Sequence, residues 1–222
     1  MPLENDRIAT RQALKLAPDS QVLALLPGSR ANEIRFLGDT FLNAAEQLCQ
    51  RHPTLQVVIP AATADRRREI SALLASYPLL VERTALLDGQ AREAMVASDV
   101  VLLASGTAAL EAMLCHRTML VAYKMAPATH WLAKRMVKTQ WVSLPNLIAQ
   151  ETLVPELIQD AASPEAIADQ LSAMLADEAS RHALETRFAE MHATLQRNAS
   201  RRAAEAINLL AAGQPLESVD GH

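Results

Sequence analysis

Residues 99–114 have the sequence Asp-Val-Val-Leu-Leu-Ala-Ser-Gly-Thr-Ala-Ala-Leu-Glu-Ala-Met-Leu, and this stretch decides the fold. Its apolar first part predicts a buried strand, the Ser-Gly-Thr sequence predicts a turn, and the apolar second part predicts a helix. Glu111 is the only charged residue between Asp99 and Arg117. We therefore expect its carboxylate either to reach water at the helix margin or to meet a ligand that donates hydrogen bonds.

The same alternation of strand and helix continues through most of the chain. Strands are expected near 21–26, 55–59, 79–82, 100–103 and 119–122, and helices at 31–51, 64–76, 91–97 and 107–114. This spacing predicts an α/β fold with a doubly wound parallel sheet, Rossmann-like, covered by helices on both faces. From residue 163 onward the pattern is helical, with helices expected at 164–175, 178–195 and 200–212.

Four regions are expected along the chain. Residues 1–20 form a linker and a short helix at 7–16, and residues 21–162 form the α/β domain. Residues 163–212 form the C-terminal helices, and residues 213–222 form a disordered tail. Ligands of such sheets bind at the carboxyl ends of the strands, so the turns that follow the strands are the first places to look for a site.

Two such turns are suited to phosphate. Ser105, Gly106 and Thr107 precede a helix whose first N–H groups lack intrahelical partners and whose dipole favours anions. Glu111 lies one turn further along the same face, where it could accept hydrogen bonds from sugar hydroxyls. A phosphate at the helix N-terminus and a ribose one turn further along the helix are together typical of a bound nucleotide. The alternative reading is a helix with one exposed glutamate.

The upstream turn has the sequence Pro27-Gly28-Ser29-Arg30 and precedes a helix from Ala31. Ser29 is a plausible N-cap, and the guanidinium of Arg30 could hold a phosphate with two hydrogen bonds. The alternative is a capped helix with a surface arginine. Neither turn fits G-x-G-x-x-G or G-x-x-x-x-G-K-[ST], which argues against an ordinary NAD site or a P-loop.

The composition limits the function classes further. The 222 residues suffice for one α/β domain with flanking helices, and half of them are apolar. A net charge of −4 argues against nucleic-acid binding. Cys49 and Cys115 lie in apolar helical contexts and indicate neither a disulfide nor a metal site, which fits a reducing cytoplasm. We find no signal peptide and no apolar run that could span a bilayer.

The segment from 123 to 155 contains two more candidates. Residues 131–138 combine Trp, Leu and Met with Lys and Arg, a pattern that suits anionic lipid or an anionic substrate. A helix with a solvated basic face is the alternative. Residues 142–146 are expected to form a strand end and a turn. Asn146 at that turn could hydrogen-bond a base or a phosphate, or could serve the turn alone.

These residues together resemble lipid-A-disaccharide synthase, a bacterial glycosyltransferase family of GT-B fold. The matching strings are Leu-Leu-Pro-Gly-Ser-Arg at 25–30, Asp-Gly-Gln-Ala-Arg-Glu-Ala-Met-Val-Ala-Ser-Asp at 88–99, Leu-Leu-Ala-Ser-Gly-Thr-Ala-Ala-Leu-Glu at 102–111, Trp-Leu-Ala-Lys-Arg-Met-Val-Lys-Thr at 131–139 and Val-Ser-Leu-Pro-Asn-Leu at 142–147. The resemblance covers most of this chain but only the C-terminal half of the family's enzyme.

The resemblance implies an inverting hexosyltransferase of lipid A biosynthesis. Such an enzyme transfers diacylglucosamine from UDP-2,3-diacylglucosamine to 2,3-diacylglucosamine 1-phosphate at the cytoplasmic face of the inner membrane, as a peripheral protein, without a metal or cofactor. This chain would supply the UDP-binding half. The implied nucleotide-binding residues are Gly28, Ser29, Arg30, Ser105, Gly106, Thr107, Glu111, Asn146 and Glu156. The first six face the diphosphate, Glu111 accepts from the ribose, and Asn146 lies against the nucleotide.

The chain also departs from the family's pattern. The family's general base is an aspartate of the N-terminal half, so no catalytic residue is expected here, and the six histidines are interpreted as structural or surface residues. The alternative function is a non-catalytic UDP-binding or membrane-associating module. A UDP-sugar epimerase is a third possibility whose motifs we do not find. Because the last GT-B helix returns to the first domain, the apolar face of 200–212 predicts self-association, as a homo-oligomer, or poor solubility where that half is missing.

Overall fold

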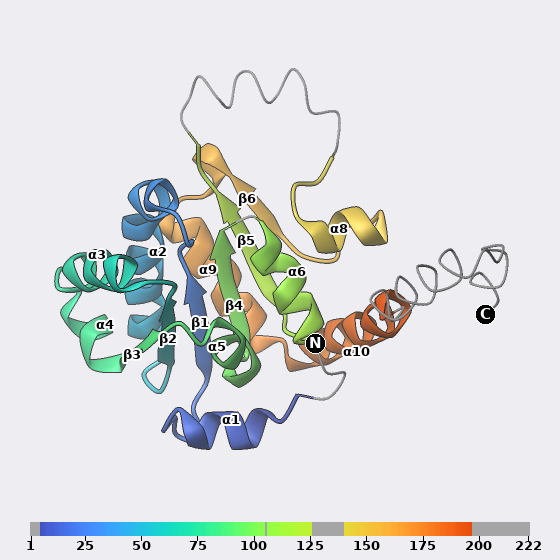
Figure 1. Ribbon diagram of the computed structural model, residues 1–222, viewed down its shortest axis with the longest axis horizontal. Helices are drawn as coiled ribbons and strands as arrows, with labels where there is room; N and C mark the ends of the chain where they lie inside the picture. Colours follow the sequence, from blue (N-terminus) through green and yellow to red (C-terminus); the bar gives the residue numbers. More distant parts are fainter. Residues whose placement is uncertain (1–4, 105, 126–139, 197–222) are drawn as a thin grey trace, which may run out of the picture.

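Short apolar segments build a parallel β-sheet in the computed structural model (Figure 1). The structure describes residues 5–104, 106–125 and 140–196. Within them the strands are β1 (Val22–Leu26), β2 (Gln56–Ala61), β3 (Thr84–Asp88), β4 (Val100–Ala104), β5 (Met119–Tyr123) and β6 (Glu156–Ile158). Their order across the sheet is β3-β2-β1-β4-β5-β6, and every described pairing is parallel. The predicted α/β fold with a doubly wound parallel sheet is confirmed.

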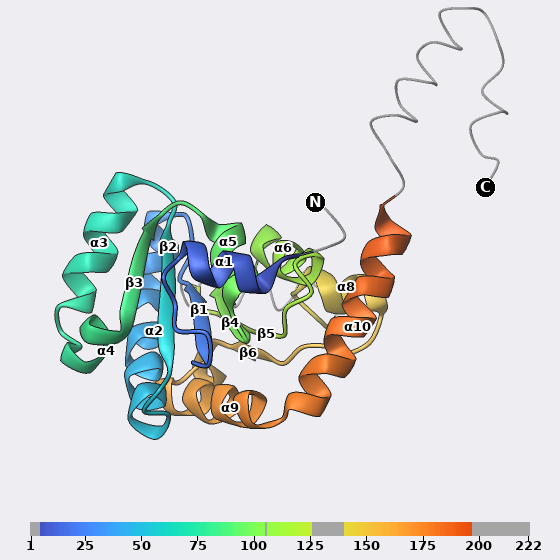
Figure 2. The same ribbon diagram turned by 90° about the horizontal axis from the view of Figure 1, so that it is seen from below.

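Helices cover both faces of this sheet (Figure 2). They are α1 (Arg7–Ala13), α2 (Ala31–Arg51), α3 (Ala64–Leu74), α4 (Pro78–Arg83), α5 (Ala91–Ala97), α6 (Thr107–Leu114), α8 (Leu144–Ala149), the 3₁₀ turn η1 (Gln159–Ala161), α9 (Pro164–Ala176) and α10 (Glu178–Leu195). Leu23 and Leu25 of β1 pack toward α2 and α9, whereas Val22 and Ala24 pack toward α5 and α6. The alternation along one strand thus supplies two aliphatic cores, one on each face.

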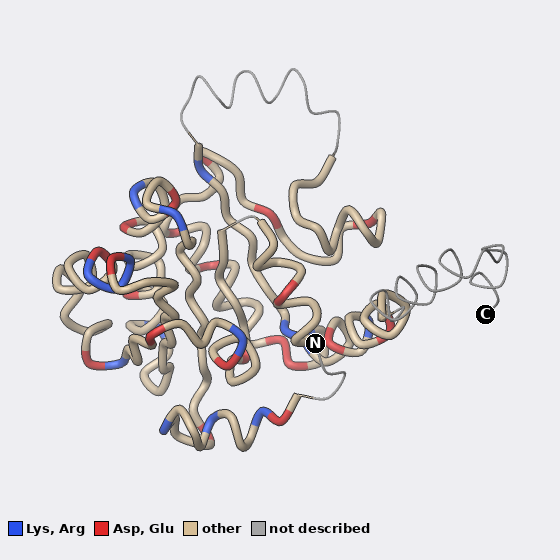
Figure 3. The backbone as a smooth tube through the Cα atoms, in the orientation of Figure 1, with Lys and Arg blue, Asp and Glu red and all other residues tan. Residues whose placement is uncertain are grey.

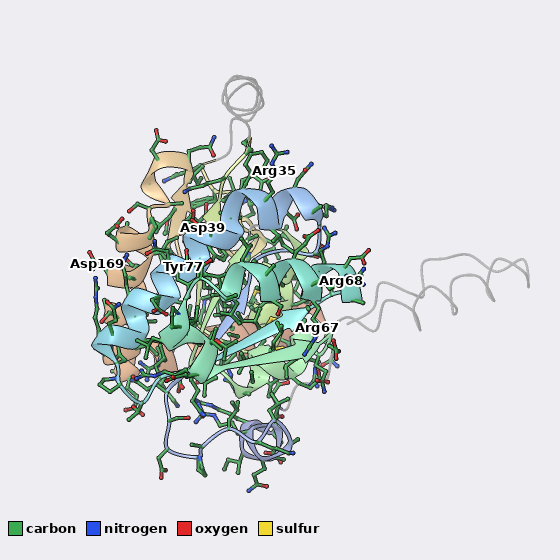
Figure 4. The ribbon with its side chains drawn as sticks, turned by 90° about the vertical axis from the view of Figure 1, so that its left-hand side faces the viewer. Arg35, Asp39, Arg67, Arg68, Tyr77 and Asp169 are labelled. Atoms are coloured by element: carbon green, nitrogen blue, oxygen red, sulfur yellow. The ribbon has the colours of Figure 1, made fainter. Side chains whose placement is uncertain are left out.

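Helix α2 positions the first candidate turn. Its apolar residues recur at helical spacing, and Ile34, Leu37 and Phe41 are almost completely buried against the sheet. On its outer side, the Tyr77 hydroxyl donates a 2.7 Å hydrogen bond to Oδ1 of Asp39, which ties the loop before α4 to the middle of α2 (Figure 4). The first half of this helix, which follows the candidate turn, is therefore fixed relative to the strands.

Most predicted elements are present, with two corrections. Residues 79–82 belong to helix α4 rather than to a strand, and the strand follows them as β3. Pro78 takes the first helical turn, where its fixed φ angle suits a helix, and Leu80 is fully buried. Residues 144–149 likewise form helix α8, which Pro145 opens, instead of the strand end and turn expected at 142–146. The short strand β6 was not predicted.

Asp99 joins helix α1 to the sheet. Its Oδ2 accepts hydrogen bonds from Nη2 of Arg11 at 2.8 Å and from the backbone N–H of Val22 at 2.7 Å. Its Oδ1 pairs with Arg7. An acid at the start of β4 thus holds the N-terminal helix against the end of the sheet opposite the candidate turns.

Other expectations concern the surface and the outer segments. Figure 3 shows Lys and Arg interspersed with Asp and Glu along α2 and α3. Within 5–104, 106–125 and 140–196, none of the helices combines the length and the apolar character needed to cross a bilayer. The basic apolar segment 131–138, the helix expected at 200–212 and the tail 213–222 lie outside the described residues, so these predictions stay predictions.

Candidate functional site

The candidate site begins where the chain changes direction in the sheet. Strands β1 and β4 are neighbours, with Leu26 of β1 beside Leu103 of β4. The connection after β1 leads to α2 on one face, and the connection after β4 leads to α6 on the other. Two adjacent parallel strands whose connections diverge leave a crevice at their carboxyl ends, which is where open α/β sheets bind ligands.

A cavity of about 380 Å³ occupies this crevice. Its walls come from the ends of β1, β2 and β4 and from the first residues of α2, α5 and α6. Both candidate turns contribute to it, through Gly28, Ser29 and Arg30 on one side and Gly106 and Thr107 on the other. The volume is in the range of ordinary small-molecule sites.

The first turn is held by an internal carboxylate. Glu33 Oε2 accepts hydrogen bonds from the backbone N–H groups of Ser29 at 2.8 Å and Arg30 at 3.1 Å, and Oε1 pairs with Nη1 of Arg30 at 3.1 Å. The N-cap of α2 is Arg30, and the expectation that Ser29 is the N-cap is therefore wrong. A glutamate three residues into the helix does the capping instead of the serine hydroxyl.

The second turn has no such cap. Gly106 is the N-cap of α6, with φ of 146°, and no side chain of the described residues caps this helix. A Cβ placed on Gly106 would meet nothing within 4 Å, so open space adjoins the backbone at this point. Gly106 and Thr107 are exposed. The unpaired N–H groups of the first helical turn are thus available to an anion in the cavity. Ser105 lies outside the described residues.

Glu111 lines the same cavity one helical turn below Thr107. It is half-buried, and its carboxylate takes part in no hydrogen bond or ion pair among the described residues. With respect to the described residues, this half-buried carboxylate is therefore an available acceptor at the wall of the cavity. It differs in this from Glu33, whose two oxygens are both engaged. Arg30 is the one cationic side chain among the described lining residues.

Asn146 and Glu156 do not line this cavity. Asn146 is fully buried, and its amide bonds the backbone of Leu153 and Val154 as well as Oε1 of Glu156. Glu156 also accepts from Ser143 Oγ at 2.6 Å. In this structure both residues join helix α8 to strand β6. A direct contact of either residue with a nucleotide stays a prediction.

The sequence reasoning did not identify the role of Glu33. An acid in the first turn of a helix is favoured by the helix dipole alone, so its presence there does not by itself indicate the pairing with the turn. The spacing of three residues between Arg30 and Glu33, at the start of an apolar periodic run, is the signal that could have revealed it.

Comparison with known proteins decides the family. The family model described as lipid-A-disaccharide synthetase matches residues 1–207 of the chain. The chain belongs to this family. It is 66% identical to the lipid-A-disaccharide synthase of Chromohalobacter salexigens over 210 residues, which are 95% of this chain and 54% of that protein. The lipid-A-disaccharide synthase of Pseudomonas putida strain F1 is 50% identical over 207 residues, 93% of this chain and 53% of that protein.

This lipid-A-disaccharide synthetase family member therefore spans about half the length of the curated relatives it matches. Among solved structures, it resembles the C-terminal domain of a group 1 glycosyl transferase (LpcC) from Francisella tularensis. The TM-score is 0.58 at 16% identity, covering 86% of this chain and 93% of that domain. That likeness confirms the fold expected for a C-terminal GT-B domain.

Proposed function

We propose that this chain holds the UDP-sugar of a lipid-A-disaccharide synthase. In that role it binds UDP-2,3-diacylglucosamine while the sugar is transferred to 2,3-diacylglucosamine 1-phosphate in lipid A biosynthesis. The observation that carries the proposal is the convergence of two turns from adjacent strands on one cavity, with Glu111 on the same wall. Family membership supports the choice of this substrate class over other nucleotides.

Each part of the cavity has a chemical task in this proposal. The uncapped N-terminus of α6 at Gly106 and Thr107 takes the diphosphate through backbone N–H groups. The guanidinium of Arg30 offsets its negative charge. Glu111 lies far enough along α6 to accept from the ribose hydroxyls rather than repel the phosphates. These contacts hold the leaving group, UDP, while the anomeric carbon is attacked.

Inverting transfer also needs a base that takes the proton of the acceptor hydroxyl as it attacks. Neither acid in the cavity suits this task, because Glu33 is engaged by the turn and Glu111 is assigned to the ribose. We assign the base to the half of the relatives that this chain does not match. The membrane surface is proposed as the source of both lipid substrates.

Calorimetric titration of UDP into the full chain tests this function. We expect saturable binding with one site per chain, and weaker binding of UMP because it lacks the β-phosphate. Circular dichroism of the same sample establishes that the chain is folded. A folded chain that binds no UDP at millimolar concentration would refute the proposed function.

A further inference from the structure

The two turns that face the cavity differ in one respect. The N-terminus of α6 has no side-chain cap from the part of the chain that the structure describes, whereas the turn before α2 is already closed by Glu33. The carboxylate takes the N–H groups of Ser29 and Arg30 at 2.8 and 3.1 Å. A second anion can gain little from donors that an internal carboxylate already occupies. The backbone of the first turn is therefore poorly placed to bind a ligand phosphate.

Glu33 is built into this turn rather than resting on it. Its side chain is 17% exposed. Gly28 adopts a φ of 120°, and a Cβ at that position would collide with Cβ and Oε2 of Glu33. The glycine thus leaves the space that the glutamate side chain fills. This packing, together with three hydrogen bonds, argues that the carboxylate stays in place when the cavity is filled.

The side chains of the first turn that remain for a ligand are the hydroxyl of Ser29 and the guanidinium of Arg30, and only the guanidinium carries a charge. The Arg30 side chain is 83% exposed, and its only partner among the described residues is Glu33, through Nη1. An exposed arginine samples many rotamers and loses that freedom on binding. The pairing with Glu33 limits those rotamers at the rim of the cavity and leaves its other N–H donors for a ligand.

We infer that Glu33 is a positioning residue, which holds the Arg30 guanidinium ready for the diphosphate of a UDP-sugar. This rests on the proposed function. Arg30 and the N-terminus of α6 then bind the phosphates, and Glu33 acts only through Arg30. Glu33 itself touches no substrate.

A double-mutant cycle on the full chain, with UDP as the probe, tests the inference. We expect E33A to weaken UDP binding about fivefold and R30A about tenfold or more, in line with the loss of one charge-assisted contact. In the R30A background, E33A is expected to change the affinity by less than about twofold, because its target is gone. S163A is the matched control, since it removes the Ser163 cap of α9 away from the cavity.

The E33Q variant decides the matter if E33A unfolds. Glutamine has a single amide oxygen. When this oxygen accepts from the two backbone N–H groups, the NH₂ group faces the Arg30 guanidinium, and two hydrogen-bond donors then oppose each other. We expect E33Q to unfold near the wild-type temperature yet to bind UDP about as weakly as E33A.

The outcomes separate the inference from the function on which it rests. A wild-type chain that binds no UDP refutes the proposed function itself. If the wild type binds UDP, unchanged affinity in both E33A and E33Q overturns the role of Glu33. If E33A lowers the UDP affinity by the same factor in the R30A background as in the wild type, Glu33 acts on the turn and not through Arg30. That result also overturns the inference. Tighter binding by E33A would mean that the carboxylate competes with the phosphates, which is the opposite of positioning.

Discussion

Gly28 and Glu33 fit together so closely that position 28 has no room for a side chain. A Cβ there would overlap the Cβ and the carboxylate oxygen of Glu33. The same carboxylate bonds the backbone of Ser29 and Arg30. Gly28 of the first turn is thus required because the Glu33 side chain fills the space where a Cβ would lie, whereas no described atom lies within 4 Å of a Cβ at Gly106 of the second turn.

Replacing Gly28 with alanine should therefore destabilise the fold through a collision as well as through backbone strain. Gly106 provides the matched control, because its φ of 146° is also far outside the left-handed helical region, but no described atom lies within 4 Å of a Cβ there. We expect G28A to lower the free energy of unfolding by about 1–3 kcal/mol more than G106A does, the usual effect of overpacking. Urea unfolding measures both. Equal losses would show that Glu33 gives way without cost.

Glu111 should contribute to UDP binding through the ribose. We expect E111A to weaken UDP binding by about 1–3 kcal/mol, the effect of leaving a hydroxyl pair without its acceptor. The loss should be much smaller for 2′-deoxy-UDP, which lacks one of the two hydroxyls. Calorimetry with both ligands measures this, and E165A, at an exposed glutamate of α9, is the control. Unchanged UDP affinity in E111A would remove Glu111 from the site.

The two cysteines should be inert in the native chain. Cys49 and Cys115 are 1% and 0% exposed, and burial raises the pKa of each thiol to about 11. Because the thiolate is the reactive form, an aromatic disulfide reagent at about pH 7.5 should label neither residue within minutes. Both should react in denaturant. Rapid labelling of the folded chain would contradict the burial of these helices.

Stability should fall when the pH drops below neutrality, in part because of His116. Nε2 of His116 lies 3.0 Å from Nδ1 of His192, a contact that joins α6 to α10. Burial, the neighbouring His192 and then Arg117 lower the pKa of His116 below its usual 6.5. As the pH falls through 6.5, His116 is therefore protonated in the unfolded chain before it is protonated in the folded one. The stability that the neutral imidazole contributes above this pH is then lost.

The variant H116N isolates this effect, because asparagine tolerates the left-handed backbone at position 116, where φ is 55°. Between about pH 7 and 5.5, we expect the wild type to lose up to about 1 kcal/mol more stability per pH unit than H116N. Urea unfolding at several pH values measures the difference. Parallel pH curves for the two proteins would show that His116 titrates as freely in the folded chain as in the unfolded one.

The predictions were accurate for those elements whose secondary structure is determined by their own residues. Helix α2, of 21 residues, has the predicted limits because its apolar residues recur at helical spacing from Ile34 to Cys49. Strand β4 and the start of α6 follow from an apolar run and a small-residue turn. The convergence of Gly28 and Gly106 on one cavity was also expected, since parallel strands place their carboxyl ends at one edge.

The predictions of secondary structure were wrong where the local sequence alone does not determine the element. The run Leu79-Leu80-Val81 is too short for its period to distinguish strand from helix, and Pro78 decided in favour of the helix. Contacts within the fold also hold Asn146, whose amide oxygen accepts from the backbone of Leu153 and Val154, and its contact with a nucleotide stays a prediction. No single-sequence pattern reveals such a satisfied partner. Glu33 is the opposite case. Its pairing with Arg30 is local, and the three-residue spacing between them could have predicted it.

The most direct test of the central claim is the position of UDP on the folded chain. Amide chemical shifts of the isotopically labelled chain, followed by NMR during a UDP titration, locate it. We predict that the largest changes cluster at Gly106, Thr107, Glu111 and Arg30. Changes confined to the opposite end of the sheet, around Gln56 and Arg83, or to helix α8 would contradict the account.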